Sequence, residues 1–343
     1  MHSPVVRKFL VMMLLLATPL LSLRAHAGDL QGAMRFVSGQ PLGVMGIDVD
    51  HLKNSILYRR LGDQLLKEMQ LHRRFDEIQN RTGLDVRRHL SSLLVVFPQQ
   101  FTDNDDSFVL IVEGPINRAK LLDSMRKKFS LTKKSTPALG EYFVTPGAKG
   151  PKLAFRGRYM VVSGDEASLK AALQPSKPSL DRRTVRWRAK RAARHSDAFI
   201  IGTSNPKLRE KLAREDPNLG KLLDLDTELR LRPGLRLSVT AHFQSKKPAE
   251  NVHGILRKGL DEATTSRIIR SFGFGRFITK IQLRRAHDTL HLDLKLSPGE
   301  VRDLVDQIEA TISKKKAGVT RRPPAPASAP DAPAPPSAPP ASP

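Results

Sequence analysis

The sequence contains no cysteine. This absence excludes a disulfide framework, a cysteine-ligated zinc site, an iron–sulfur cluster and a cysteine nucleophile. Aromatic residues are also few, at 5% with a single Trp, which argues against a groove that stacks sugars or single-stranded nucleic acid. Acidic residues are outnumbered, with 34 Asp and Glu against 58 Lys and Arg and a formal net charge of +24. The 343 residues are 39% hydrophobic, which is enough for a buried core and, by length, for two domains.

The first 27 residues have the organisation of a secretory signal peptide. Arg7 and Lys8 form a positive start, residues 9–23 are mostly apolar, and Ala25-His26-Ala27 is a small-x-small cleavage site that would leave Gly28 first. The apolar stretch is shorter than the roughly 20 residues of a spanning helix, and no later stretch is long and apolar enough to span a bilayer. We therefore expect an exported protein, periplasmic or extracellular, with no transmembrane segment after cleavage.

Charge and composition divide the remaining chain into four parts. We predict a first α+β lobe at 28–173, a basic connecting segment at 174–195, a second lobe at 196–313 and a disordered tail at 314–343, which is Lys-rich and then Pro/Ala-rich. The connecting segment holds eight cations and one acid. Its net charge is therefore as large as that of either much longer lobe.

The order of the predicted elements repeats. Each lobe is expected to contain a strand, helices, a hairpin, a helix, a second hairpin and a last helix. Hairpins with helices between them imply antiparallel sheets with helices packed on one face. The predicted fold is therefore α+β, with two similar lobes joined by a basic helical connection. The expected strands are 42–49, 93–97, 108–112, 141–145, 152–156 and 159–163 in the first lobe, and 198–202, 228–231, 235–243, 277–283 and 290–296 in the second.

Three segments resemble a group of exported bacterial proteins of unknown function. They are 46–52 (GIDVDHL), 83–85 (GLD) and 152–173 (KLAFRGRYMVVSGDEASLKAAL). The resemblance extends over about residues 40–310, and it implies export and a duplicated α+β fold. It carries no known active residues, so none is transferred to this chain.

Common catalytic and metal-binding motifs are absent. The sequence has no HExxH, GxGxxG, GxxxxGK[ST] or GxSxG pattern. His287, Asp288 and His291 suggest a metal, but a predicted hairpin places the first two in its turn and His291 on the polar face of the next strand. The acidic run at 103–106 lacks the Gly and terminal Glu of a calcium loop. We predict no catalytic residue, no metal and no cofactor, and a protein that is more a binding protein than an enzyme.

The basic connecting segment is the most unusual motif. Residues 182–194 hold seven cations in thirteen positions, with the single Trp among them. As a helix, the segment would place Val185, Ala189, Ala192 and Ala193 on one narrow apolar stripe, with cations around the rest. Arg binds phosphate or carboxylate groups through two hydrogen bonds, and Trp can stack on a base or lie at a lipid interface. The candidate anion-binding residues are therefore Arg182, Arg183, Arg186, Trp187, Arg188, Lys190, Arg191 and Arg194.

Three functions remain open at this point. The first is a non-enzymatic envelope protein that binds anionic lipid, lipopolysaccharide, acidic polysaccharide or nucleic acid through 182–194. The second is a hydrolase or small-ligand carrier with a site between the lobes. The third is a structural or assembly factor that contacts envelope proteins through an exposed apolar patch. A purely structural interpretation of 182–194 also exists, in which Trp187 anchors a solvated helix in the core and its Arg side chains pair with acids of either lobe.

Overall fold

The computed structural model describes residues 28–68, 71–82, 85–99, 108–146, 150–174, 181–271 and 273–319. The expected signal peptide, the acidic hairpin tip at 103–106 and the Pro/Ala-rich part of the tail lie outside these described residues. Within them, no helix combines the length and the apolar character that crossing a membrane requires.

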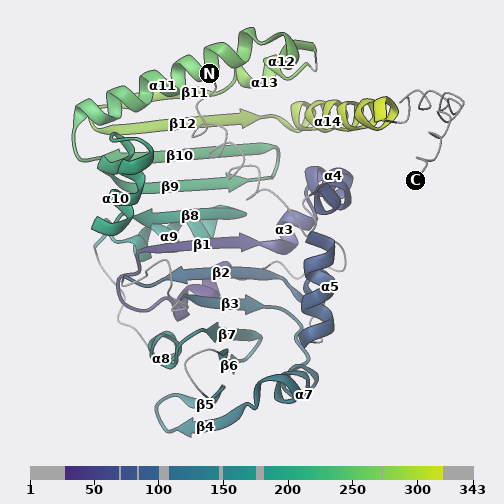
Figure 1. Cartoon of the computed structure of the whole chain (residues 1–343), viewed down its shortest axis with the longest axis vertical. Coiled ribbons are helices and arrows are strands. Elements are labelled where there is room, and N and C mark those ends of the chain that lie inside the picture. The colour runs from purple at the N-terminus through teal and green to yellow at the C-terminus, as the bar shows by residue number, and fades with distance from the viewer. Residues whose placement is uncertain are drawn as a thin grey trace, which may run out of the picture.

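The strands of the described residues form one twelve-stranded antiparallel sheet, with β1 and β8 side by side near its middle (Figure 1). Outward from this central pair, the order is β1-β2-β3-β7-β6 in one direction and β8-β9-β10-β12-β11 in the other. The two halves of the chain therefore arrange equivalent strands in the same order, and β5 and β4 extend the first half. The strands are β1 (Gly43–Asp48), β2 (Ser92–Phe97), β3 (Val109–Glu113), β4 (Thr132–Thr136), β5 (Gly140–Val144), β6 (Lys152–Arg156), β7 (Tyr159–Ser163), β8 (Ala198–Thr203), β9 (Leu222–Arg230), β10 (Leu235–Phe243), β11 (Gln282–Ala286) and β12 (Thr289–Leu296).

Helices cover both faces of the first half of the sheet. In the second half, α9 (Val185–His195) packs against β8, and α11 (Lys246–Thr265) runs alongside the edge strand β11 (Figure 1). In chain order the helical elements of the described residues are α2 (Leu30–Ala33), η1 (Met34–Phe36), α3 (Val49–Lys53), α4 (Ile56–Glu68), α5 (Leu71–Thr82), α6 (Val86–His89), α7 (Arg118–Phe129), α8 (Glu166–Leu173), α9 (Val185–His195), α10 (Pro206–Glu215), η2 (Leu219–Lys221), α11 (Lys246–Thr265), α12 (Arg267–Ser271), α13 (Gly275–Ile278) and α14 (Pro298–Val319).

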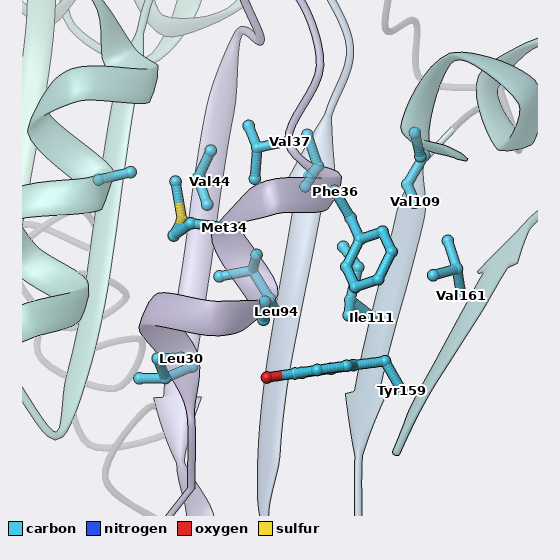
Figure 2. Packing of buried hydrophobic residues seen from close by; sticks show 14 of the residues in the cluster. Leu30, Met34, Phe36, Val37, Val44, Leu94, Val109, Ile111, Tyr159 and Val161 are labelled. Carbon is cyan, nitrogen blue, oxygen red and sulfur yellow. The ribbon is translucent and has the colours of Figure 1, made fainter. Parts of the chain in front are cut away.

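The largest buried cluster lies between the sheet and four short helical elements, α2, η1, α8 and α9. Figure 2 shows part of it, with Leu30, Met34 and Phe36 packed over side chains of the strands beneath. A second cluster places Leu121 and Met125 of α7 on other strand residues of the first half. Alternate residues of a strand point to opposite faces, so the half-buried pattern of these strands supplies both clusters.

The predicted α+β class with antiparallel strands is confirmed. The structure differs from the expectation in two details: the strands of both halves join in one sheet, and helices cover two faces of the first half rather than one. The physical reason lies in the central strands. Both β1 and β8 are nearly continuous apolar runs, which is typical of strands that are covered on both faces and have a neighbour on each side.

Local signals placed most elements correctly, and three strand predictions were wrong or missing. β9 begins at Leu222 rather than at 228, and 275–278 form α13 before β11 starts at Gln282. Four of the five residues of β4 are exposed, and its sequence has no alternation of apolar and polar residues. This strand was therefore not predicted from the sequence.

The predicted helix starts at Asn205 and Ser297 are confirmed. Asn205 Oδ1 accepts a hydrogen bond from the Leu208 N–H at 2.7 Å. Ser297 and Glu300 form the expected capping box, in which the Ser297 N–H donates to Glu300 Oε2 at 2.8 Å. At the other end, α14 continues to Val319, so the first residues of the tail expected from 314 are helical. Lys is a good helix former and its charge favours a helix C-terminus.

Candidate anion-binding surface

The basic segment forms α9, an amphipathic helix that lies on the sheet. Thr184 caps it by accepting the Trp187 N–H at 3.3 Å. Val185, Ala189 and Ala192 are buried in the largest core cluster, and Ala193 packs against that cluster. These small side chains allow the helix backbone to approach β8 and β1 closely, and the predicted apolar stripe is the face that is buried. The prediction of a basic helical connection is therefore confirmed.

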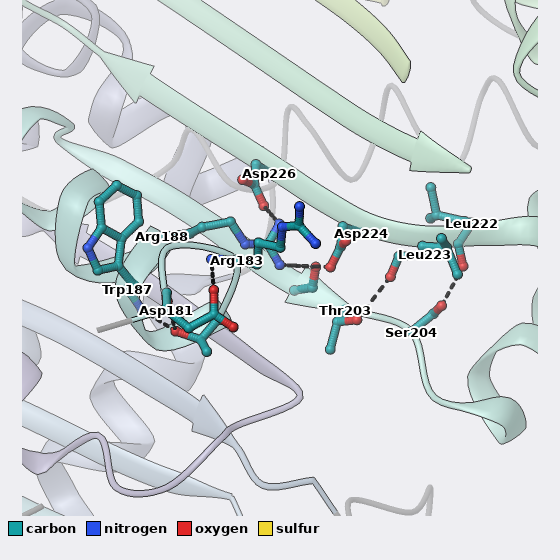
Figure 3. Close-up of polar contacts among 12 residues, drawn as sticks. Asp181, Arg183, Trp187, Arg188, Thr203, Ser204, Leu222, Leu223, Asp224 and Asp226 are labelled. Carbon is teal, nitrogen blue, oxygen red and sulfur yellow. Dashed lines mark hydrogen bonds and ion pairs between the residues drawn. The ribbon is translucent and has the colours of Figure 1, made fainter. Parts of the chain in front are cut away.

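Arg188 points inward and is neutralised inside the protein. Its side chain is only 11% exposed. Nη1 lies 2.6 Å from Asp226 Oδ1 and Nη2 lies 2.8 Å from Asp224 Oδ1, both on β9. In Figure 3 the guanidinium reaches toward these two carboxylates, away from Trp187. Burial raises the pKa of Asp226, and the charge of Arg188 opposes that rise.

Arg191 is the second cation with a partner on the sheet. Its Nη2 lies 3.2 Å from Oε1 of Glu228, and its guanidinium lies 5.9 Å from the centre of the Trp187 ring. Glu228 also accepts the Ser196 hydroxyl at 2.8 Å. Arg186 is half-buried, and burial lowers its pKa. The pairs that Arg188 and Arg191 form with carboxylates of β9 therefore attach the helix to the sheet.

The remaining cations of the segment face solvent. Arg182, Arg183, Lys190 and Arg194 are exposed, and none of them has a carboxylate within ion-pair distance among the residues that the structure describes. Trp187, Lys190 and Arg194 follow a spacing of three and four, which places them on one face of a helix. Trp187 is half-buried and belongs to none of the buried clusters. The helix is anchored by its Val and Ala residues, so Trp187 is not the core anchor that the structural interpretation expected. The other part of that interpretation, pairing of Arg side chains with acids, holds for Arg188 and Arg191.

A hollow of about 340 Å³ lies where the end of α9 meets β9 and β10. Three arginines and one histidine surround it, against a single carboxylate, that of Glu228. Arg236 is exposed and has no ion-pair partner among the described residues, whereas Arg230 lies 3.8 Å from Glu228. The hollow therefore extends the cationic surface of α9 onto the part of the sheet that β9 and β10 form. Its lining residues are Arg191, His195, Glu228, Arg230, Arg236 and Ser238.

The residues that first suggested a metal do not converge. His287 lies in the turn before β12 with a φ of 52°, and His291 on β12 lies 3.2 Å from the Thr240 hydroxyl. No group of three His, Asp or Glu side chains in the described chain is arranged to hold a metal ion.

Sequence reasoning missed a polar cluster at the junction of the two halves. His51 Nδ1 lies 2.9 Å from Asp197 Oδ1 and 3.3 Å from Asp48 Oδ2. Asp48 is 4% exposed, and burial raises its pKa to about 6. The local signal was present, because Asp48 also caps α3 by accepting the His51 N–H at 2.8 Å. The contact of His51 with Asp197 was not predicted, because the two residues lie far apart in the sequence.

No family model matches this chain, and no curated protein matches it. Among solved structures, crystal form III of TP0453 is similar at 12% identity with a TM-score of 0.44, covering 84% of this chain and 100% of that chain. Crystal form I of TP0453 is similar at 13% identity with a TM-score of 0.41, covering 84% and 99%. At this level the similarity says nothing about function.

Proposed function

We propose that this protein is an exported, non-enzymatic protein of the bacterial envelope that binds an anionic surface or polymer through the outer face of α9. The observation that carries the proposal is the division of the α9 cations into two groups. Arg188 and Arg191 are paired with carboxylates of the sheet. Arg182, Arg183, Lys190 and Arg194 remain exposed on a helix that these pairs and its apolar stripe hold in place.

A preformed row of cations suits phosphate or carboxylate groups that repeat along a surface. Cations near an anionic lipid surface contribute about 1 kcal/mol each, and the attraction decreases with salt. Trp187 lies among them with part of its ring exposed, and an indole favours the interface between lipid headgroups and acyl chains. Anionic lipid headgroups are therefore the first ligand to test, with acidic polysaccharide and nucleic acid as the other anions of the same charge class.

The hollow at the end of α9 supplies a place for one anionic group. Arg191, Arg230 and Arg236 converge on it from a helix and two strands. Glu228 is already paired with Arg191 and Arg230, which reduces its repulsion of an incoming anion. Binding at this hollow would extend the contact from α9 onto the sheet.

The two other hypotheses have less support in the geometry. A site between the lobes needs two lobes that face each other, whereas β1 and β8 pair edge to edge through backbone hydrogen bonds. An assembly surface needs a contiguous apolar patch. The large apolar side chains that are exposed in the described chain are Phe108, Phe129, Leu208 and Ile255, and they lie on or beside four different elements.

Co-sedimentation of chain 28–343 with vesicles tests the proposal. Vesicles of phosphatidylcholine with phosphatidylglycerol are compared with phosphatidylcholine alone across a salt series. A variant with Arg182, Arg183, Lys190 and Arg194 changed to Gln keeps Arg188 and Arg191, so the fold is retained. We expect binding that requires the anionic lipid, falls as salt rises, and is at least tenfold weaker in the variant.

A matched control separates this surface from general charge. Changing Lys207, Arg257, Arg267 and Arg302 to Gln removes the same number of charges from exposed positions on four other helices, α10, α11, α12 and α14. This control is expected to bind within about threefold of the unchanged chain, allowing for the smaller net charge. Equal binding by both variants would contradict the α9 surface. DNA and an acidic polysaccharide then serve as competitors to rank the anions.

A further inference from the structure

The backbone at residues 28 and 29 is held against a buried polar cluster. The Asp29 N–H donates to Glu113 Oε2 at 2.6 Å. Glu113 is 2% exposed, accepts the Ser92 hydroxyl at 2.5 Å and pairs with Arg158 at 2.9 Å. These contacts fix the position of the peptide unit that follows Gly28.

Gly28 lies closer to its neighbours than a side chain allows. A Cβ atom at this residue would be 2.5 Å from the carbonyl oxygen of Ser91 and 3.0 Å from Asp48 Oδ1. A carbon atom there would collide with the carbonyl group, so the position requires glycine. A nitrogen donor can come closer to an oxygen than a carbon can, because the N···O distance in a charge-assisted hydrogen bond is about 2.7–2.9 Å. An ammonium group fits, with small adjustments, where a methyl group does not.

The carboxylate beside this position is buried with little to offset its charge. Asp48 Oδ1 accepts the His51 N–H, and its Oδ2 lies 3.3 Å from the His51 ring. The same ring nitrogen lies nearer to Asp197, at 2.9 Å, so one imidazole is shared between two carboxyl groups. The raised pKa of Asp48 has burial as its largest cause. A further cation at hydrogen-bond distance would stabilise its ionised form.

We propose that the α-ammonium group of Gly28 is this cation in the mature chain, donating to the Asp48 carboxylate and the Ser91 carbonyl. The inference rests on cleavage after Ala27, which belongs to the proposed export. Hydrolysis of the Ala27–Gly28 peptide bond consumes one water, leaves a carboxylate on Ala27 and frees the amine of Gly28, which binds a proton at neutral pH.

The geometry of an N-terminal glycine permits this placement. Once the bond to Ala27 is cut, rotation about the Cα–C bond of Gly28 moves the nitrogen among the tetrahedral positions on Cα. One of these is the position that a Cβ would take, beside Ser91 and Asp48. In an uncleaved chain the nitrogen is an uncharged amide joined to Ala27 and cannot form the ion pair.

The ion pair would couple processing to the junction of the two halves. The Asp48 N–H donates to the Asp197 carbonyl at 2.7 Å, and the Asp197 carboxylate accepts the Leu231 N–H at 2.5 Å. Stabilising ionised Asp48 therefore stabilises a network that spans β1, β8 and the end of β9. The mature chain is then more stable than a chain that retains residues before Gly28.

Three versions of the protein test this inference. One begins at Gly28, one begins at Ala27, and one begins at Gly28 with its amine acetylated. The first is expected to have a Tm a few degrees above the other two at pH 7, and Asp48→Asn is expected to remove the difference. Asp261→Asn, at an exposed carboxyl on α11, removes the same charge and is expected to leave the difference unchanged.

The pH dependence gives a second readout. Without the free amine, the pKa of Asp48 in the folded chain, about 6, lies above its unfolded value of about 4. The folded state then binds the proton more tightly, so stability falls as pH rises from about 4 to about 6. The chain that begins at Gly28 is expected to lose less stability over this interval. The charges of His51, Asp50 and Asp197 also act on Asp48, but all three chains share them.

Equal Tm values for the three chains would overturn the inference, and so would a difference that persists in Asp48→Asn. Sequencing the N-terminus of the exported protein tests the cleavage, and a first residue other than Gly28 would also overturn it. Vesicle binding through α9 is expected to be the same in all three chains. Failure of this inference and failure of the anion-binding proposal are therefore distinguishable.

Discussion

Replacing Arg188 with methionine is expected to lower the free energy of unfolding by about 3–4 kcal/mol. The side chain is 11% exposed and its guanidinium pairs with two carboxylates, Asp224 and Asp226. Methionine preserves much of the apolar stem but removes the charge. Breaking a buried pair by deleting one partner is costly because the remaining charges lose their compensation in a poorly solvated place.

The loss is expected to depend on pH. Burial already raises the pKa of Asp226, and Arg188 limits that rise. Without Arg188 the folded-state pKa moves further above the unfolded value of about 4. When a carboxyl group has a higher pKa in the folded state than in the unfolded state, the folded protein loses stability as pH rises from the unfolded value to the folded value. The deficit of Arg188→Met relative to the unchanged chain is therefore expected to be larger at pH 7 than at pH 4.5.

Urea unfolding at the two pH values measures this effect. Lys190→Met on the exposed face of the same helix is the control and is expected to change the free energy by about 0.5 kcal/mol or less. Adding Asp224→Asn and Asp226→Asn to Arg188→Met is expected to restore part of the loss, since no stranded charge remains. A loss below about 1 kcal/mol in Arg188→Met, or no restoration in the triple variant, would contradict the assigned role.

Replacing Phe199 with alanine is expected to cost about 4 kcal/mol, in the middle of the range for Phe→Ala in cores. Phe199 on β8 is 2% exposed and lies in the cluster beneath α9. Its cross-strand partner on β1 is Gly46, which has no side chain to fill the space that the ring leaves. The cavity would open at the pair of strands that joins the two halves. Phe129→Ala, at a 36% exposed position on α7, is the control and is expected to cost far less.

A double-mutant cycle with Gly46→Ala makes the packing argument specific. A Cβ at Gly46 would lie 2.4 Å from Cε1 of Phe199, so Gly46→Ala alone is expected to be destabilising. In the Phe199→Ala background the same methyl group has room and helps to fill the cavity. The two changes together are therefore expected to cost less than their sum, by about 1–3 kcal/mol. Additive costs, measured by urea unfolding, would show that the ring and Gly46 do not pack as described.

Local chemistry made much of the fold predictable. Strands at 152–156, 159–163 and 235–243 have the predicted bounds, because alternation and flanking turn residues lie within a few positions of one another. The helix starts at Asn205 and Ser297 follow from contacts over three residues. In the basic segment, the stripe of Val185, Ala189 and Ala192 predicted the face that is buried.

The candidate site was only partly predictable, because some of its contacts join residues that lie far apart in the sequence. The sequence identified the cations of 182–194 but not which of them face inward. Arg188 is neutralised by Asp224 and Asp226, which lie 36 and 38 residues later on a strand that was expected to begin only at 228. The hollow at the end of α9 depends on Arg230 and Arg236, whose place beside the helix follows from the register of β9 and β10.

The sequence alone determined the α+β class, most of the elements and the apolar face of α9, because each depends on residues close together in the chain. Only the tertiary structure decided that β1 pairs with β8, that both halves share one sheet, and that Gly28 lies against Asp48 and Ser91. These contacts join segments that are tens to more than a hundred residues apart. They are selected by burial and by the pairing of charges in the assembled protein, which no local pattern records.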